Sequence, residues 1–112
     1  MDITSRQENE IYIVKLEGDF SSVTIPAFKN FIEDLLKKGA KKIVLDMQDV
    51  PHITSAGIQC LIVLLEHLKT NNVRICLCSL NESVTKLLKM FNLEKDLPIF
   101  DNRKSALEFL RT

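Results

Sequence analysis

Apolar residues recur along this chain in two kinds of run, which predict alternating strands and helices. Residues 11–16, IYIVKL, are rich in β-branched and aromatic side chains and predict a strand, with residues 3–8 as a weaker edge strand beside it. Residues 25–38 carry apolar side chains at three- and four-residue spacing, which predicts an amphipathic helix. Pro26 suits the first turn of this helix, and Gly39 suits the position just after its end.

The second half of the chain repeats this order of strand and helix. Residues 42–47, KIVLDM, form a short apolar run that is typical of a central strand. Residues 58–68 are apolar on almost every side, which predicts a helix packed between layers. Residues 73–80, VRICLCSL, predict the next strand.

Two further helices are predicted near the end of the chain. Asn81 is a predicted cap for a helix whose apolar face consists of Val84, Leu87, Leu88 and Phe91. A short strand at residues 97–100, LPIF, is followed by Asn102 as a second predicted cap. The last helix should then bury Ala106, Leu107 and Leu110.

This alternation predicts the α/β class, as a single domain over residues 1–112. We expect a four-to-five-stranded, mostly parallel sheet with helices packed on it. Partner and ligand sites in such sheets tend to lie at the carboxyl ends of the strands. Two loops have that location: residues 18–24, GDFSSVT, and residues 46–57, DMQDVPHITSAG.

Composition narrows the classes of function. Of 112 residues, 46% are hydrophobic and 27% charged, as in ordinary globular proteins. The 15 basic and 15 acidic residues give a net charge of zero, which argues against a nucleic-acid partner. The longest fully apolar run, residues 60–65, is far too short to cross a bilayer, and no export signal is visible. We therefore expect a cytoplasmic protein that does not insert into a membrane.

The cysteines and histidines do not indicate a metal site or a disulfide framework. The chain has three cysteines, Cys60, Cys76 and Cys78, and an odd number cannot form a complete disulfide framework. Free cysteines behave mostly as small buried hydrophobes. His52 and His67 are too few and too scattered to complete a zinc site of the usual spacing. No cofactor or metal ion is expected.

Ser55 is the most distinctive candidate for chemistry. It precedes a long apolar helix, so its hydroxyl could cap the unpaired N–H groups of the first turn. The same N–H groups and the helix dipole would also stabilise a phosphate attached to it. Ala56 and Gly57 are small and would leave the approach to that hydroxyl open. Capping and modification both remain possible at this point.

The sequence gives little support for catalysis. The stretch TSAG is not the G-x-S-x-G turn of serine hydrolases, and His52 is expected to point away from Ser55. Asp46 and Asp49 could pair to hold Mg²⁺, but acidic residues at strand ends are more often solvated or capping. We expect a binding protein rather than an enzyme.

The order of elements and three stretches of sequence resemble the STAS domain. The stretches are VKLEGDF, IVLDMQDVPHITSAGIQCLIVLLEHLK and VRICLCSLNESVTKLLKMFNLEKDLPIF. The pattern is most similar to that of the stand-alone anti-sigma factor antagonists of bacteria. In that family a strand ends in Asp, and Asp-Ser, a small residue and Gly then open a helix. Asp46 and the run Thr54-Ser55-Ala56-Gly57 occupy those positions here.

The resemblance implies a partner switch. An antagonist of this family binds an anti-sigma factor that is also a serine kinase, and phosphorylation of the serine matching Ser55 releases it. A PP2C-type phosphatase resets the system. Thr54 is a secondary candidate acceptor. The partner is expected to contact a surface formed by Ser21, Ser22, His52, Thr54, Gly57, Ile58 and Gln59.

Two residues depart from the family pattern. Thr54 replaces the acid that usually precedes the phosphorylated serine, and Ser21 stands where an acid is common. Both changes remove negative charge around Ser55. The alternative function is that of a STAS subunit without phosphorylation, in a lipid-transport ATPase or a signalling scaffold.

Overall fold

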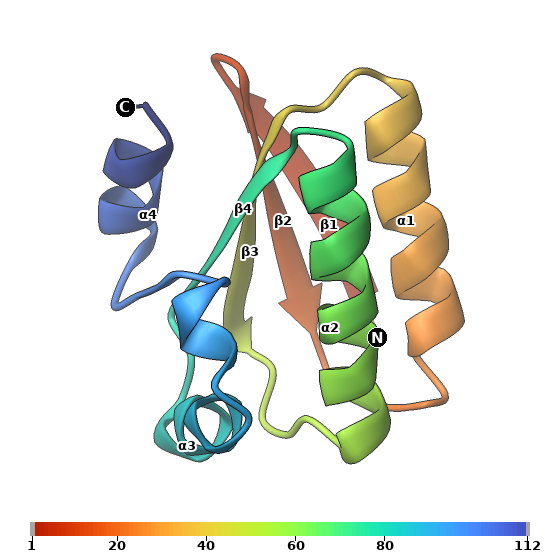
Figure 1. Ribbon diagram of the computed structural model, residues 1–112, viewed down its shortest axis with the longest axis vertical. Helices are drawn as coiled ribbons and strands as arrows, with labels where there is room; N and C mark the ends of the chain where they lie inside the picture. The colour runs from red at the N-terminus through yellow and green to blue at the C-terminus, as the bar shows by residue number, and fades with distance from the viewer. Residues whose placement is uncertain (1, 112) are drawn as a thin grey trace.

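The computed structural model describes residues 2–111, which fold as a five-stranded sheet covered by helices on both faces (Figure 1). β1 (Asp2–Glu8) and β2 (Ile11–Glu17) form an antiparallel hairpin at one edge. β3 (Lys42–Asp49), β4 (Arg74–Cys78) and β5 (Ile99–Phe100) follow β2 in parallel, in the order β1-β2-β3-β4-β5. The α/β class and the mostly parallel sheet are confirmed. Residues 1 and 112 of the predicted domain lie outside the described residues.

The helices divide unequally between the two faces of the sheet. α1 (Ile25–Lys37), α2 (Ser55–Thr70) and α3 (Glu82–Met90) pack on one face, followed by the short 3₁₀ helix η1 (Leu93–Lys95). α4 (Arg103–Arg111) covers the other face. Figure 1 shows α1 and α2 side by side, with α4 alone on the far side of the strands.

The protein has two hydrophobic cores, one on each face of the sheet, because side chains alternate between the faces along each strand. In β3, Ile43 and Leu45 belong to the core under α1 and α2, whereas Val44 belongs to the core under α4. β4 follows the same rule, because Ile75 joins the larger core and Cys76 the smaller one. Successive side chains of a strand point to opposite faces, so each central strand contributes to both cores.

The helix ends are largely as predicted. Asn81 Oδ1 accepts a hydrogen bond from the Val84 amide at 2.8 Å, and Asn102 Oδ1 accepts one from the Ser105 amide at 2.8 Å. Both residues are therefore the predicted caps. Phe91 is an exception, since it follows the last turn of α3 and is 48% exposed. Its assignment to the apolar face of that helix was wrong.

α2 differs from the predicted helix in two ways. It begins at Ser55, three residues before the apolar run, and it packs on the sheet with one side only. Its outer side is open enough that Val63 is 51% exposed, so the expectation of a helix between two layers is wrong. Within residues 2–111, no helix combines the length and hydropathy that crossing a membrane requires.

Candidate functional site

Two loops meet beside the first turn of α2 and form the candidate site. One joins β2 to α1 and the other joins β3 to α2, and both lie at the lower end of the molecule in Figure 1. The Phe20 amide donates to the His52 carbonyl at 3.0 Å, and the Thr54 amide donates to the Phe20 carbonyl at 3.0 Å. A parallel bridge between Phe20 and Ile53 completes the contact. The two loops predicted at the carboxyl ends of the strands are thus held together by backbone hydrogen bonds.

Thr54, rather than Ser55, caps α2. Its backbone is extended, and Thr54 Oγ1 accepts a hydrogen bond from the Gly57 amide at 3.2 Å. The same hydroxyl donates to the Phe20 carbonyl at 3.4 Å. The Thr54 hydroxyl therefore both caps the helix and donates to the neighbouring loop, and the expectation that Ser55 supplies the cap is corrected.

Ser55 is the first residue of α2 and is exposed to solvent. Within the described part of the chain, its hydroxyl forms no hydrogen bond, because the capping role is filled by its neighbour. Ala56, which follows it, is also exposed. The first turn of α2 contains no acidic residue, so the positive end of the helix dipole is not offset there by a carboxylate of the helix.

Gly57 and Ile58 do not lie on the predicted contact surface. A Cβ atom on Gly57 would lie 2.5 Å from Phe20 Cδ1 and 2.7 Å from the Phe20 carbonyl oxygen, so only glycine fits this contact. Ile58 is 1% exposed and packs in the larger core. Both residues support the site from beneath, and their assignment as partner contacts is corrected.

The remaining predicted contact residues are accessible. Ser22, His52 and Gln59 are exposed, and Ser21 is half-buried. Gln59 lies one turn after Ser55 on the same side of α2. Val23, in the β2–α1 loop, is also exposed, at 86%. We call the following set the Ser55 surface: Ser21, Ser22, His52, Thr54, Ser55, Ala56 and Gln59.

Asp46 and Asp49 have separate cationic partners. Asp46 is buried on the α4 side of the sheet, where its Oδ2 lies 2.6 Å from Arg103 Nη2. Asp49 Oδ2 lies 3.2 Å from Lys15 Nζ. The two carboxylates are therefore not arranged as a pair for Mg²⁺. Within residues 2–111, no three His, Cys, Asp or Glu side chains gather in a way that could hold a metal ion.

The three cysteines are free and buried, as predicted. Burial raises the pKa of the Cys76 thiol to about 12 and that of the Cys78 thiol to about 11. Burial also raises the pKa of Cys60, although the nearby Lys29 ammonium opposes this effect. Thiols with raised pKa values are poor nucleophiles, so these cysteines act as packing residues at neutral pH.

Sequence relatives and solved structures match nearly the whole of this chain. An anti-sigma F factor antagonist of Paenibacillus polymyxa is 23% identical over 108 residues, which cover 96% of this chain and 92% of that protein. The crystal structure of TM1081 from Thermotoga maritima superposes with a TM-score of 0.91 at 25% identity, covering 98% of this chain and 95% of that one.

The antagonist SpoIIAA of Bacillus has the same fold. Its unphosphorylated form superposes with a TM-score of 0.73 and its phosphorylated form with 0.74, each at 14% identity. The superpositions cover 98% of each chain in the first case, and 97% of this chain and 99% of that chain in the second. The model of the STAS domain matches residues 2–106. This protein therefore belongs to the STAS domain family.

Proposed function

We propose that this protein is an anti-sigma factor antagonist controlled by phosphorylation of Ser55. In its unmodified form it binds an anti-sigma factor that is also a serine kinase, through the Ser55 surface. Phosphorylation by that kinase releases it, and a PP2C-type phosphatase restores the binding form. The main observation that supports this proposal is the position of Ser55. This residue is exposed at the start of α2, and its hydroxyl forms no hydrogen bond among the described residues.

The geometry favours Ser55 over Thr54 as the phosphate acceptor. The Thr54 hydroxyl bridges the Gly57 amide and the Phe20 carbonyl. Phosphorylation of Thr54 would break the bond to the Phe20 carbonyl, because a phosphate ester oxygen has no proton to donate there. Ser55 can be modified without breaking any side-chain hydrogen bond among the described residues.

A phosphate at Ser55 would change binding without unfolding the protein. It adds about −1.5 to −2 charges at neutral pH, next to the N–H groups that open α2. Those groups can stabilise the phosphate inside the free protein. In a packed complex, however, the same charge would have to lose its water, and this loss costs free energy unless the partner compensates the charge. Modification therefore weakens the complex.

Thr54, which replaces the acid that usually precedes the phosphorylated serine, keeps the helix-capping role of that acid. Asp and Thr are both effective helix caps, because each offers a side-chain oxygen to the N–H groups of the first turn. Thr54 forms that bond at 3.2 Å. The replacement therefore keeps the start of α2 in place and removes one negative charge beside Ser55. We infer that the protein that binds this chain needs less positive charge opposite position 54 than the partner of a relative with Asp at that position.

The test is a phosphorylation assay with the anti-sigma kinase of the same organism. The kinase, ATP and the purified protein are incubated, and the product is mapped by mass spectrometry. We expect phosphate on Ser55 in the native protein and in Thr54→Ser, and none in Ser55→Ala. Phosphate on Thr54 alone, or none on either residue while the kinase modifies a control substrate, would refute the proposed switch.

A further inference from the structure

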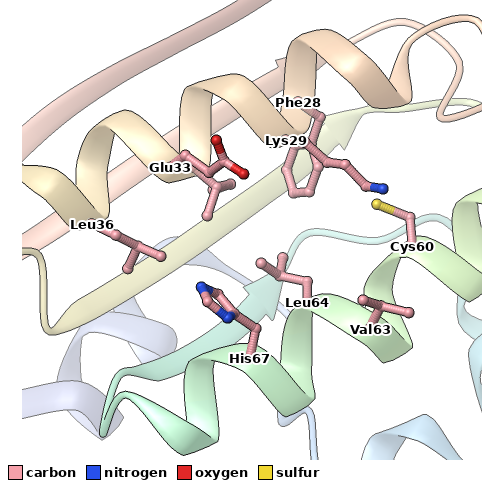
Figure 2. A pocket seen from close by; sticks show the side chains of 9 residues that line it. Phe28, Lys29, Glu33, Leu36, Cys60, Val63, Leu64 and His67 are labelled. Carbon is pink, nitrogen blue, oxygen red and sulfur yellow. The ribbon is translucent and has the colours of Figure 1, made fainter.

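A groove of about 240 Å³ separates α1 from α2 on the outer side of the molecule (Figure 2). Its apolar surface comes from both helices and consists of Leu36, Val63 and Leu64, with the buried side chains of Phe28, Ile32 and Cys60 beneath them. The volume lies below the roughly 300–1,000 Å³ that is typical of pockets for drug-sized ligands. The groove is therefore suited to a small ligand with an apolar body.

Ionisable side chains stand around this apolar lining. Lys29 and Glu33 come from successive turns of α1, and His67 comes from α2. In Figure 2 the Lys29 ammonium extends toward Cys60 and the His67 ring points into the space between the helices. Within residues 2–111, neither Lys29 nor Glu33 forms an ion pair. The groove thus carries one positive and one negative group that are free for a ligand.

These charges restrict the chemical class of the ligand. An apolar anion would be attracted by Lys29 but repelled by Glu33. An apolar cation would be attracted by Glu33 but repelled by Lys29. A zwitterion satisfies both groups at once, because its two charges are held close together on one molecule. The apolar lining then requires that the zwitterion also carry a large apolar substituent.

We propose that the groove between α1 and α2 binds an α-amino acid with a large apolar side chain. The carboxylate of the ligand pairs with the Lys29 ammonium, and its ammonium group pairs with the Glu33 carboxylate. The side chain packs against Val63 and Leu64. This site is separate from the Ser55 surface, and the inference does not depend on the proposed phosphorylation.

The groove is nevertheless in contact with the residues that support Ser55. The ring of Phe28 meets the ring of Phe20 edge-on, with 4.9 Å between the centroids. Phe20 in turn accepts hydrogen bonds from the amide and hydroxyl of Thr54 through its carbonyl oxygen. Phe28 is fully buried, so its ring lies beneath the groove and separates a ligand there from Phe20 and the loop that opens α2. Occupancy of the groove should be detectable at the amides of Thr54 and Ser55.

The experiment titrates ¹⁵N-labelled protein with four matched compounds and follows the amide resonances. The compounds are phenylalanine, 3-phenylpropionate without the ammonium group, phenethylamine without the carboxylate, and glycine without the side chain. Concentrations up to about 10 mM detect even affinities weaker than 1 mM. We expect shifts at Cys60, Leu64 and His67, and at least tenfold tighter binding of phenylalanine than of the other three.

Charge-removing variants of α1 test the pairing directly. Lys29→Met should weaken phenylalanine binding about tenfold but should tighten phenethylamine binding, because it removes a like charge. Glu33→Gln should likewise weaken phenylalanine binding and tighten 3-phenylpropionate binding. Lys37→Met and Asp34→Asn are the controls, because both residues are exposed on α1 outside the groove. The inference is overturned if none of the compounds shifts the groove amides, or if binding does not depend on Lys29 and Glu33.

Discussion

The carbonyl oxygen of Phe20 accepts two hydrogen bonds from Thr54, one from its amide at 3.0 Å and one from its hydroxyl at 3.4 Å. This contact fixes the β2–α1 loop against the residue that opens α2. The same hydroxyl also accepts a hydrogen bond from the Gly57 amide, whereas the Ser55 hydroxyl has no hydrogen-bond partner among residues 2–111. The structural role therefore belongs to Thr54, and the proposed phosphorylation concerns the neighbouring hydroxyl of Ser55.

Removal of the Thr54 hydroxyl should destabilise the protein. Thr54→Val keeps the shape of the side chain but loses the cap and the bond to Phe20, and we expect a loss of about 1 kcal/mol in the free energy of unfolding. Urea unfolding followed by circular dichroism measures this loss. Thr54→Ser, which retains the hydroxyl, should stay close to the native value. Equal stability of Thr54→Val and Thr54→Ser would show that the cap is unimportant.

Gly57 should not tolerate a Cβ atom. In Gly57→Ala the new methyl group would overlap Phe20 and lie 2.8 Å from Ile53 Cγ1, so we expect a loss of about 1–3 kcal/mol. Thermal unfolding provides the measurement. Ala56→Ser, at the exposed neighbouring position, is the control and should be nearly neutral. A native-like melting temperature for Gly57→Ala would contradict the close approach of α2 to the Phe20 loop.

The buried carboxylate of Asp46 should require its partner on α4. Arg103→Met leaves the charge of Asp46 without a cation, which should cost about 1–3 kcal/mol in stability. Asp46→Asn combined with Arg103→Met should cost less than Arg103→Met alone, because no unpaired charge remains. Denaturant unfolding of the native protein, both single variants and the double variant measures the coupling. Strict additivity of the two single effects would argue against the ion pair.

The buried thiol of Cys78 should make the fold sensitive to alkali. Burial raises its pKa to about 11 in the folded state from the ordinary value of 9.0. The unfolded state therefore loses the proton first, so the contribution of Cys78 to stability is complete below pH 9 and declines as the pH rises toward 11. Cys78→Ala should show a shallower decline in unfolding free energy over that range. Parallel curves for the two proteins would refute this prediction.

Periodicity predicted the elements whose apolar side chains occupy a single face. In α1 and α4 the apolar residues recur at helical spacing beside charged ones, and the structure buries the same residues, among them Phe28, Ile32 and Leu110. The mostly parallel sheet was predicted as well, because strands that alternate with helices favour parallel crossover connections.

The details around Ser55 could not be predicted in the same way. Thr and Ser are similarly good caps, so their order along the chain does not show which hydroxyl the helix uses. The first turn of α2 consists of the small residues Ser55, Ala56 and Gly57, which do not extend the apolar pattern of residues 58–68. That pattern therefore could not show where α2 begins. The burial of Ile58 depends on the rotation of that first turn against the sheet, which only the folded structure defines.

The most direct test of the account compares the affinity of the native protein for its anti-sigma kinase with that of Ser55→Asp, by calorimetry. We predict that the negative charge at Ser55 weakens binding at least tenfold, which corresponds to about 1.4 kcal/mol. Ser5→Asp is the matched control, since it adds the same charge at an exposed position on β1, and it should bind like the native protein. Equal affinities for the native protein and Ser55→Asp would contradict the phosphorylation switch.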